Sequence, residues 1–218
     1  MKTVLVIALL LAATDGAVYA QDGAPTLPAD LAYVAEKAED VIDYYQGGEW
    51  QSAQAVVDSM TAREESVEAE LHSDDLPESS AYLFDFFLFE LRALTRQQTQ
   101  SLQAALTANQ ITALLIDAQQ HYSHKVPMEV AWVDYLGREI VLLAQYPEDR
   151  FTLDHRVAEL GRTWARIEND VNSRNGQKVA ASVNEELTKL GKTESRPEMI
   201  NSANRILDLV DELEGLYQ

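Results

Sequence analysis

The spacing of apolar residues is the feature that most constrains the fold of this chain. From residue 28 to residue 216 they recur at steps of three and four, which is the period of an amphipathic α-helix. No run alternates Val, Ile or Thr with polar residues between hairpin turns, as a strand would. We therefore expect an all-α protein, either an antiparallel helical bundle or a stack of αα-hairpins.

Glycine, asparagine and proline divide this pattern into about eight predicted helices. The segment around residues 82–89 is apolar on nearly every side, so we expect other helices to surround it. Residues 28–218 are long enough to form a single domain with its own core. The expected helices cover residues 28–46, 50–71, 79–108, 109–124, 128–146, 148–172, 177–190 and 197–216.

The first twenty residues have the three parts of a secretory signal peptide. Lys2 supplies a positive start, residues 4–13 form an apolar region, and residues 17–20 end in small side chains of the kind that signal peptidase recognises. This apolar region is shorter than the roughly 20 residues that span a bilayer. We therefore expect cleavage after residue 20, a flexible leader over 21–27, and a periplasmic or secreted protein.

The chain contains no cysteine, so its stability has to come from the packed core and not from disulfides. An exported protein without cysteine is more typical of a bacterial periplasm than of a eukaryotic secretory route. No later segment is apolar for long enough to span a membrane, so we expect no integral membrane segment after signal cleavage.

Acidic residues outnumber basic residues by 36 to 17, which gives a net charge of −19. A field of this sign repels the phosphates of nucleic acids and anionic lipid headgroups. The expected partners are another exported protein or a cationic ligand, and we expect no nucleic acid. An acidic surface also suits a saline habitat, with no specific ligand at all.

Asp117, His121 and His124 are the residues for which the sequence predicts a metal site. In a continuous helix they lie at positions i, i+4 and i+7 and share one stripe, so a carboxylate and two imidazoles could hold one divalent cation. The stripe lies about 110° from the apolar stripe of the same helix. An exposed polar stripe without a ligand is the other interpretation, and a haem bound by His121 or Met128 is a further hypothesis.

Acidic residues also interrupt the two most apolar predicted helices. Asp85 and Glu90 lie in the third helix, and Asp134 and Glu139, with Arg138 between them, lie in the fifth. A local ion pair between Asp134 and Arg138, at positions i and i+4, is the ordinary explanation for the second case. If these carboxylates converged in an internal pocket, they could carry out acid–base chemistry.

Motifs for nucleophilic catalysis, phosphate binding and dinucleotide binding are absent from the sequence. We therefore predict an exported, non-catalytic binding or accessory protein that acts through contacts with a protein or a small ligand. The second hypothesis is a periplasmic divalent-metal-binding protein, and the third is an enzyme that uses acids in an internal pocket.

Overall fold

The computed structural model describes residues 24–72, 76–98, 100–146 and 150–218. This part of the chain contains nine α-helices and no strand, so the all-α prediction is confirmed. The predicted signal peptide lies outside the described residues. The helices are α1 (Ala29–Gly47), α2 (Trp50–Thr61), α3 (Glu64–Leu71), α4 (Ser79–Gln97), α5 (Ser101–Gln119), α6 (Met128–Leu143), α7 (Arg150–Ser173), α8 (Gln177–Leu190) and α9 (Arg196–Gly215).

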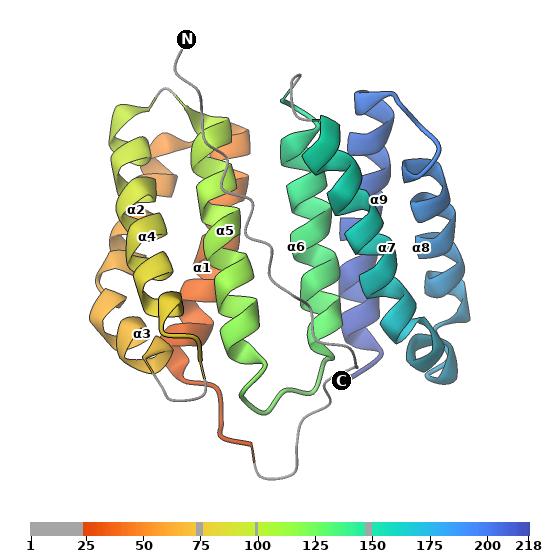
Figure 1. Cartoon of the computed structure of the whole chain (residues 1–218), viewed down its shortest axis with the longest axis horizontal. Helices are drawn as coiled ribbons and strands as arrows, with labels where there is room; N and C mark the ends of the chain where they lie inside the picture. Colours follow the sequence, from red (N-terminus) through yellow and green to blue (C-terminus); the bar gives the residue numbers. More distant parts are fainter. Residues whose placement is uncertain (1–23, 73–75, 99, 147–149) are drawn as a thin grey trace.

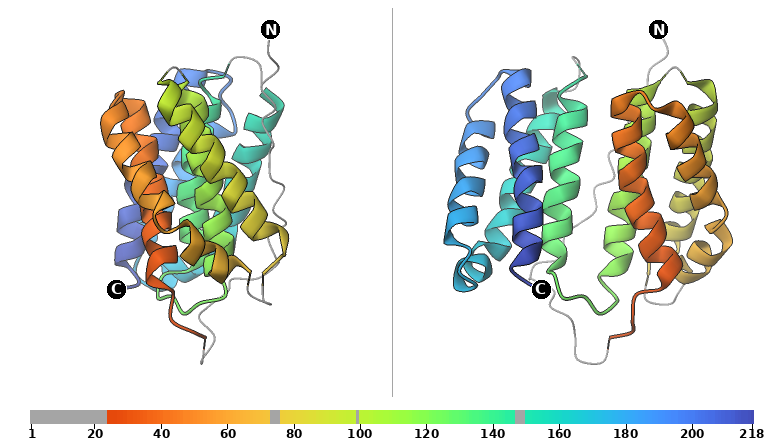
Figure 2. Two further views of the ribbon diagram at one scale, coloured as in Figure 1. Left: turned by 90° about the vertical axis from the view of Figure 1, so that its left-hand side faces the viewer. Right: turned by 180° about the vertical axis from the view of Figure 1, so that it is seen from behind.

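The helices stand side by side in two groups that follow the order of the chain (Figure 1). One group contains α1 to α5 and the other contains α6 to α9, and the same division is visible from behind (Figure 2). Within the groups, α5 packs on α1 and α4, while α6 packs on α7 and α9. The two groups meet where α5 contacts α6. None of the described helices combines the length and the apolar character needed to cross a lipid bilayer.

The predicted division into helices is wrong at several points. The segment 50–71 forms two helices, α2 and α3, and the break predicted at Asn109 lies instead between α4 and α5. At this break Gln98 adopts a left-handed backbone with φ 53°, and neither glycine nor asparagine marks the position in the sequence. Asn109 lies inside α5, where its side chain has a buried partner.

The described end of the predicted leader is attached to the bundle. The backbone N–H of Ser123 donates a hydrogen bond to the carbonyl oxygen of Pro25 at 2.8 Å. Thr26 forms an isolated bridge with the same residue. Residues 25 and 26 therefore lie against the loop that joins α5 to α6.

Helix α5 is enclosed on all sides along most of its length. Every residue from 104 to 116 is buried. The buried set includes the apolar stripe expected from the sequence and also polar residues on the other sides of the helix, namely Thr107, Asn109, Gln110 and Thr112. The polar residues on these sides therefore need partners in neighbouring helices.

Helix α4 is not enclosed, so the prediction that helices surround its aromatic segment is wrong. Tyr82, Phe86 and Phe89 are 64%, 47% and 66% exposed. The helices that pack closely on α4 are α2, α3 and α5. They cover only one side of it, whose buried apolar residues are Ala81, Phe84, Phe87, Leu88, Leu91 and Leu94.

A buried polar network joins the two helix groups across α5, α6 and α7. Glu139, which is 1% exposed, accepts hydrogen bonds from Asn109 Nδ2 at 2.6 Å and from Gln110 Nε2 at 3.3 Å. The Nε atom of Arg156 lies 3.8 Å from Glu139 Oε1, and its Nη1 donates to Glu159 at 2.7 Å. Burial raises the pKa of Glu139, while Arg156 and the two amides lower it.

Gly176 lies between α7 and α8 at a point where a side chain does not fit. A Cβ atom there would lie 2.7 Å from the carbonyl oxygen of Val171 and 2.6 Å from Leu216 Cδ1. We expect Gly176→Ala to lower the free energy of unfolding by about 1–3 kcal/mol, measured by urea denaturation, because the backbone has to move.

Gly161 is the matched control for this substitution, since a Cβ atom at this position in α7 meets nothing within 4 Å. Alanine has the higher helix propensity, so Gly161→Ala should raise stability by about 0.5–1 kcal/mol. Equal changes in the free energy of unfolding for the two substitutions would show that the close contacts at Gly176 do not exclude a Cβ atom.

Candidate functional site

The exposed face of α4 carries three aromatic side chains, Tyr82, Phe86 and Phe89, which we call the aromatic stripe. They occupy positions i, i+4 and i+7, so they lie along one side of the helix. Given their exposed fractions, they present roughly 300–400 Å² of ring surface to solvent. Exposed apolar patches of a few hundred Å² on folded proteins are often functional.

Two of the three rings of the aromatic stripe contact a neighbouring ring. The ring of Phe86 lies 5.5 Å from the ring of Phe87 in an edge-on arrangement, and Phe87 is buried in the core. Tyr82 packs edge-on against His72, the residue that follows α3, with 6.0 Å between the ring centroids. The stripe is therefore fixed on a regular helix, which reduces the ordering cost of a contact.

An acidic triad lies beside the aromatic stripe and consists of Glu64 and Glu68 from α3 and Asp85 from α4. One carboxylate oxygen from each lies within 4.8 Å of the other two. Among the described residues this is the one group of three or more acidic or histidine side chains with such spacing. Asp85 lies three residues after Tyr82 and four before Phe89 on α4, so the triad adjoins the stripe. Arg92 partly neutralises it, with Nη1 3.7 Å from Glu64 Oε2.

Burial raises the pKa of Glu64, and the carboxylates of Asp85 and Glu68 raise it further, while Arg92 lowers it. The triad thus holds more negative charge than its own cation compensates. Oxygen ligands in this arrangement favour a hard metal cation, an ammonium group or a guanidinium group. The sequence pointed to Asp85 alone, because the other two acids belong to a different helix.

The three predicted metal ligands lie at the end of α5 and in the loop that follows. Because α5 ends at Gln119, only Asp117 lies within the helix, and the expectation of one continuous stripe is wrong. His121 is exposed, and Nδ1 of His124 lies 2.9 Å from the carbonyl oxygen of Tyr122. Burial raises the pKa of Asp117 and His121 lowers it. Metal binding by these three residues stays a prediction.

The structure does not bring the acids proposed for catalysis into one place. Asp85 is exposed and Glu90 half-buried on α4, whereas Asp134 lies on α6 in the other helix group. Asp134 instead forms the expected ion pair with Arg138, with Oδ2 and Nη1 2.8 Å apart. None of these three acids lines the pocket between α8 and α9 or the pocket at the start of α2.

Asp134 belongs to a second concentration of negative charge, where α1, α6 and α9 meet. Arg138 reaches across to α1, with Nη2 3.1 Å from Glu39 Oε2. Burial raises the pKa of Asp134 to about 7; Glu39, Glu214 and Asp211 add to the shift, and Arg138 opposes it. This position is therefore sensitive to pH near neutrality.

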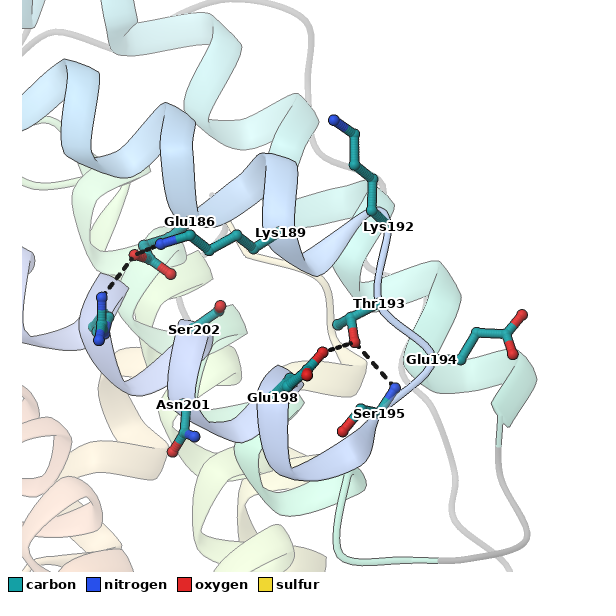
Figure 3. Close-up of a pocket in the computed structure, with 10 residues that line it drawn as sticks. Glu186, Lys189, Lys192, Thr193, Glu194, Ser195, Glu198, Asn201 and Ser202 are labelled. Carbon is teal, nitrogen blue, oxygen red and sulfur yellow. Dashed lines mark hydrogen bonds and ion pairs between the residues drawn. The ribbon is translucent and has the colours of Figure 1, made fainter.

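A pocket of about 680 Å³ lies between α8 and α9 (Figure 3). All ten of its lining residues are polar or charged. Two of its cations form ion pairs with one of its own acids: Lys189 Nζ and Arg205 Nη1 lie 2.8 and 3.4 Å from Glu186 Oε1. Ligand sites are usually lined by apolar side chains with a few convergent polar groups, so this pocket is the weaker candidate.

No protein-family model, curated protein or solved structure matches this chain. Inference about its function therefore rests on its own residues. Among the described residues, the aromatic stripe contains three of the four large apolar side chains that remain exposed, and the acidic triad adjoins it.

Proposed function

We propose that this protein is an exported, non-catalytic binding protein and that it contacts another protein through the aromatic stripe of α4. The exposure of Tyr82, Phe86 and Phe89 is the observation that carries the proposal. Removing apolar surface from water is favourable by about 25 cal/mol per Å². Aromatic residues are also enriched at the centres of protein interfaces, where they carry much of the binding energy.

Two further features support the proposal. The N-terminal pattern of residues 1–20 is that of a signal peptide, which supports export. Of the acids that might have formed a catalytic group, Asp85 and Glu90 lie on α4 and Asp134 lies on α6. The pocket between α8 and α9 is lined by polar residues with ion pairs among them, so neither place offers an obvious reaction centre.

The proposal is tested by placing a photoreactive phenylalanine at position 89 of the full chain, made in its own cells. We expect a discrete crosslinked species from the exported fraction that weakens when Tyr82→Gln is added, because both rings belong to the same surface. The protein in this fraction should also lack residues 1–20 by mass.

The matched control carries the photoreactive group at Phe151. This residue is 85% exposed near the start of α7 and is, in the described part of the chain, the one large exposed apolar side chain outside α4. An equal crosslinking pattern from positions 89 and 151 would show that exposure alone accounts for the signal, and it would contradict a docking function for α4.

A further inference from the structure

We infer that the aromatic stripe receives a cationic amphipathic helix of the partner, whose apolar side chains cover the stripe and whose Lys or Arg enters the acidic triad. This inference rests on the proposed function and adds the chemical class of the partner. It combines two neighbouring features of α3 and α4, the exposed rings and the crowded carboxylates.

The charge of the triad argues for a cation from outside. Arg92 pairs with Glu64, but no Lys, Arg or His of the described chain lies in an ion pair with Glu68 or Asp85. Three carboxylates thus lie within 4.8 Å of one another, and the paired guanidinium contacts only Glu64, at 3.7 Å. A Lys or Arg of a partner would stabilise the charged form of Glu64, as Arg92 does. Charge-assisted hydrogen bonds to carboxylates are among the stronger polar contacts.

The geometry of the stripe argues for a helix. Tyr82 and Phe89 lie seven residues apart on α4, which corresponds to roughly 10 Å along the axis. Rows of side chains at this spacing interdigitate with the rows of a second helix. On its other side α4 already packs against helices, namely α2, α3 and α5. A partner helix with apolar residues at i, i+3, i+4 and i+7 would cover the remaining side.

Electrostatics disfavour the other occupants of this surface. A second copy of the chain would bring another net charge of −19 and an identical triad, so like charges would face each other. Anionic lipid headgroups would be repelled for the same reason. A basic partner is attracted both by the triad and by the field of the whole protein.

The test uses a synthetic helical peptide of about 18 residues, with Leu at i, i+3, i+4 and i+7 and Lys on the flanking positions. A second peptide keeps the Leu face and carries Glu in place of Lys. Calorimetry with the mature protein at about 0.15 M salt limits diffuse attraction. We expect a dissociation constant in the micromolar range for the Lys peptide and binding at least about tenfold weaker for the Glu peptide.

Two double variants locate the binding surface. Tyr82→Gln with Phe89→Gln should weaken binding of the Lys peptide by about tenfold, because it removes the two most exposed rings of the stripe. Glu68→Gln with Asp85→Asn should weaken it by about fivefold and reduce its salt dependence. Phe89→Leu keeps an apolar side chain and should retain binding, which separates a lost contact from a lost fold.

Matched controls change the same kinds of residue elsewhere. Phe151→Gln removes an exposed ring from α7, and Glu194→Gln with Glu212→Gln removes two exposed negative charges from the other helix group. Neither should change the affinity. The helical circular dichroism of every variant should match that of the unsubstituted protein, and every variant should keep a cooperative melting transition.

The outcomes separate the inference from the proposed function. Loss of binding in the stripe variant with full affinity in the triad variant overturns the cationic partner and leaves the proposed function standing. Full affinity in the stripe variant overturns both. Self-association that depends on Phe89, or Phe89-dependent binding to phosphatidylcholine vesicles without binding to the Lys peptide, also overturns the inference.

Discussion

Replacing Arg156 by methionine is expected to lower the free energy of unfolding by about 3–5 kcal/mol at about pH 8. Arg156 is 3% exposed and is the cation nearest to the buried carboxylate of Glu139. Methionine preserves the apolar stem of the side chain but leaves the negative charge of Glu139 without its positive partner. Urea denaturation measures the loss.

The loss should be smaller at about pH 5, because burial already raises the pKa of Glu139 and removing Arg156 raises it further. Adding Glu139→Gln should recover much of the stability, since the double variant buries no charge at this position. Arg150→Met is the matched control: its pair with Asp154 is exposed, and we expect a loss below about 1 kcal/mol. Equal losses for Arg156→Met and Arg150→Met would contradict the importance of the buried network.

Asp134→Asn is expected to make the protein more stable than the unsubstituted chain above neutral pH. The pKa of Asp134 is raised from 3.8 to about 7 by folding, chiefly through burial. The folded state therefore retains a proton that the unfolded chain releases. The stability linked to this proton is fully present below pH 3.8 and is lost as the pH rises through about 7.

The asparagine variant should escape this loss, because its amide does not ionise. We expect an advantage of at most about 4 kcal/mol at about pH 8, which shrinks as the pH falls and disappears below about pH 4. Denaturation curves at several pH values measure it. Asp154→Asn, at an exposed ion pair of α7, should show no such pH-dependent gain. A difference between Asp134→Asn and the unsubstituted protein that stays constant with pH would contradict the assignment.

The location of Asp134 gives this pH dependence a structural meaning. It lies near Glu39 of α1 and near Asp211 and Glu214 of α9, so its ionisation adds charge where three helices from both groups approach each other. Ionisation of Asp134 therefore acts on the contact between the two helix groups as well as on the local stability of α6.

The sequence by itself determined the features that depend on neighbours along the chain. The period of three and four residues identified the helices, because one side of each helix has to be buried. Gly48, with φ 73°, ends α1 as expected, and α9 starts with proline in its first turn. The ion pair of Asp134 and Arg138 was predictable because both residues lie on one helix, four residues apart.

Other features were decided only by contacts between distant segments. The sequence predicts a helix break at Asn109, yet this residue lies within α5, where Glu139, thirty residues later in the chain, accepts its hydrogen bond. The acidic triad likewise joins acids from α3 and α4 that no sequence spacing connects. The left-handed residue Gln98 also belongs here, because its backbone conformation ends α4 without the glycine that usually marks such a position.

The largest difference concerns which helix the others cover. The apolar residues of α4 cover more than one side of the helix, which predicted that other helices enclose it. The apolar residues of the segment that forms α5 follow one side, which predicted a helix with one polar side. The structure reverses these roles: α5 is enclosed and α4 exposes Tyr82, Phe86 and Phe89. The sequence shows which side chains are apolar and are therefore stabilised by burial. Whether they are buried depends on helices that are distant in the sequence and pack against them. Only the tertiary packing therefore decided that the rings of α4 remain in solvent.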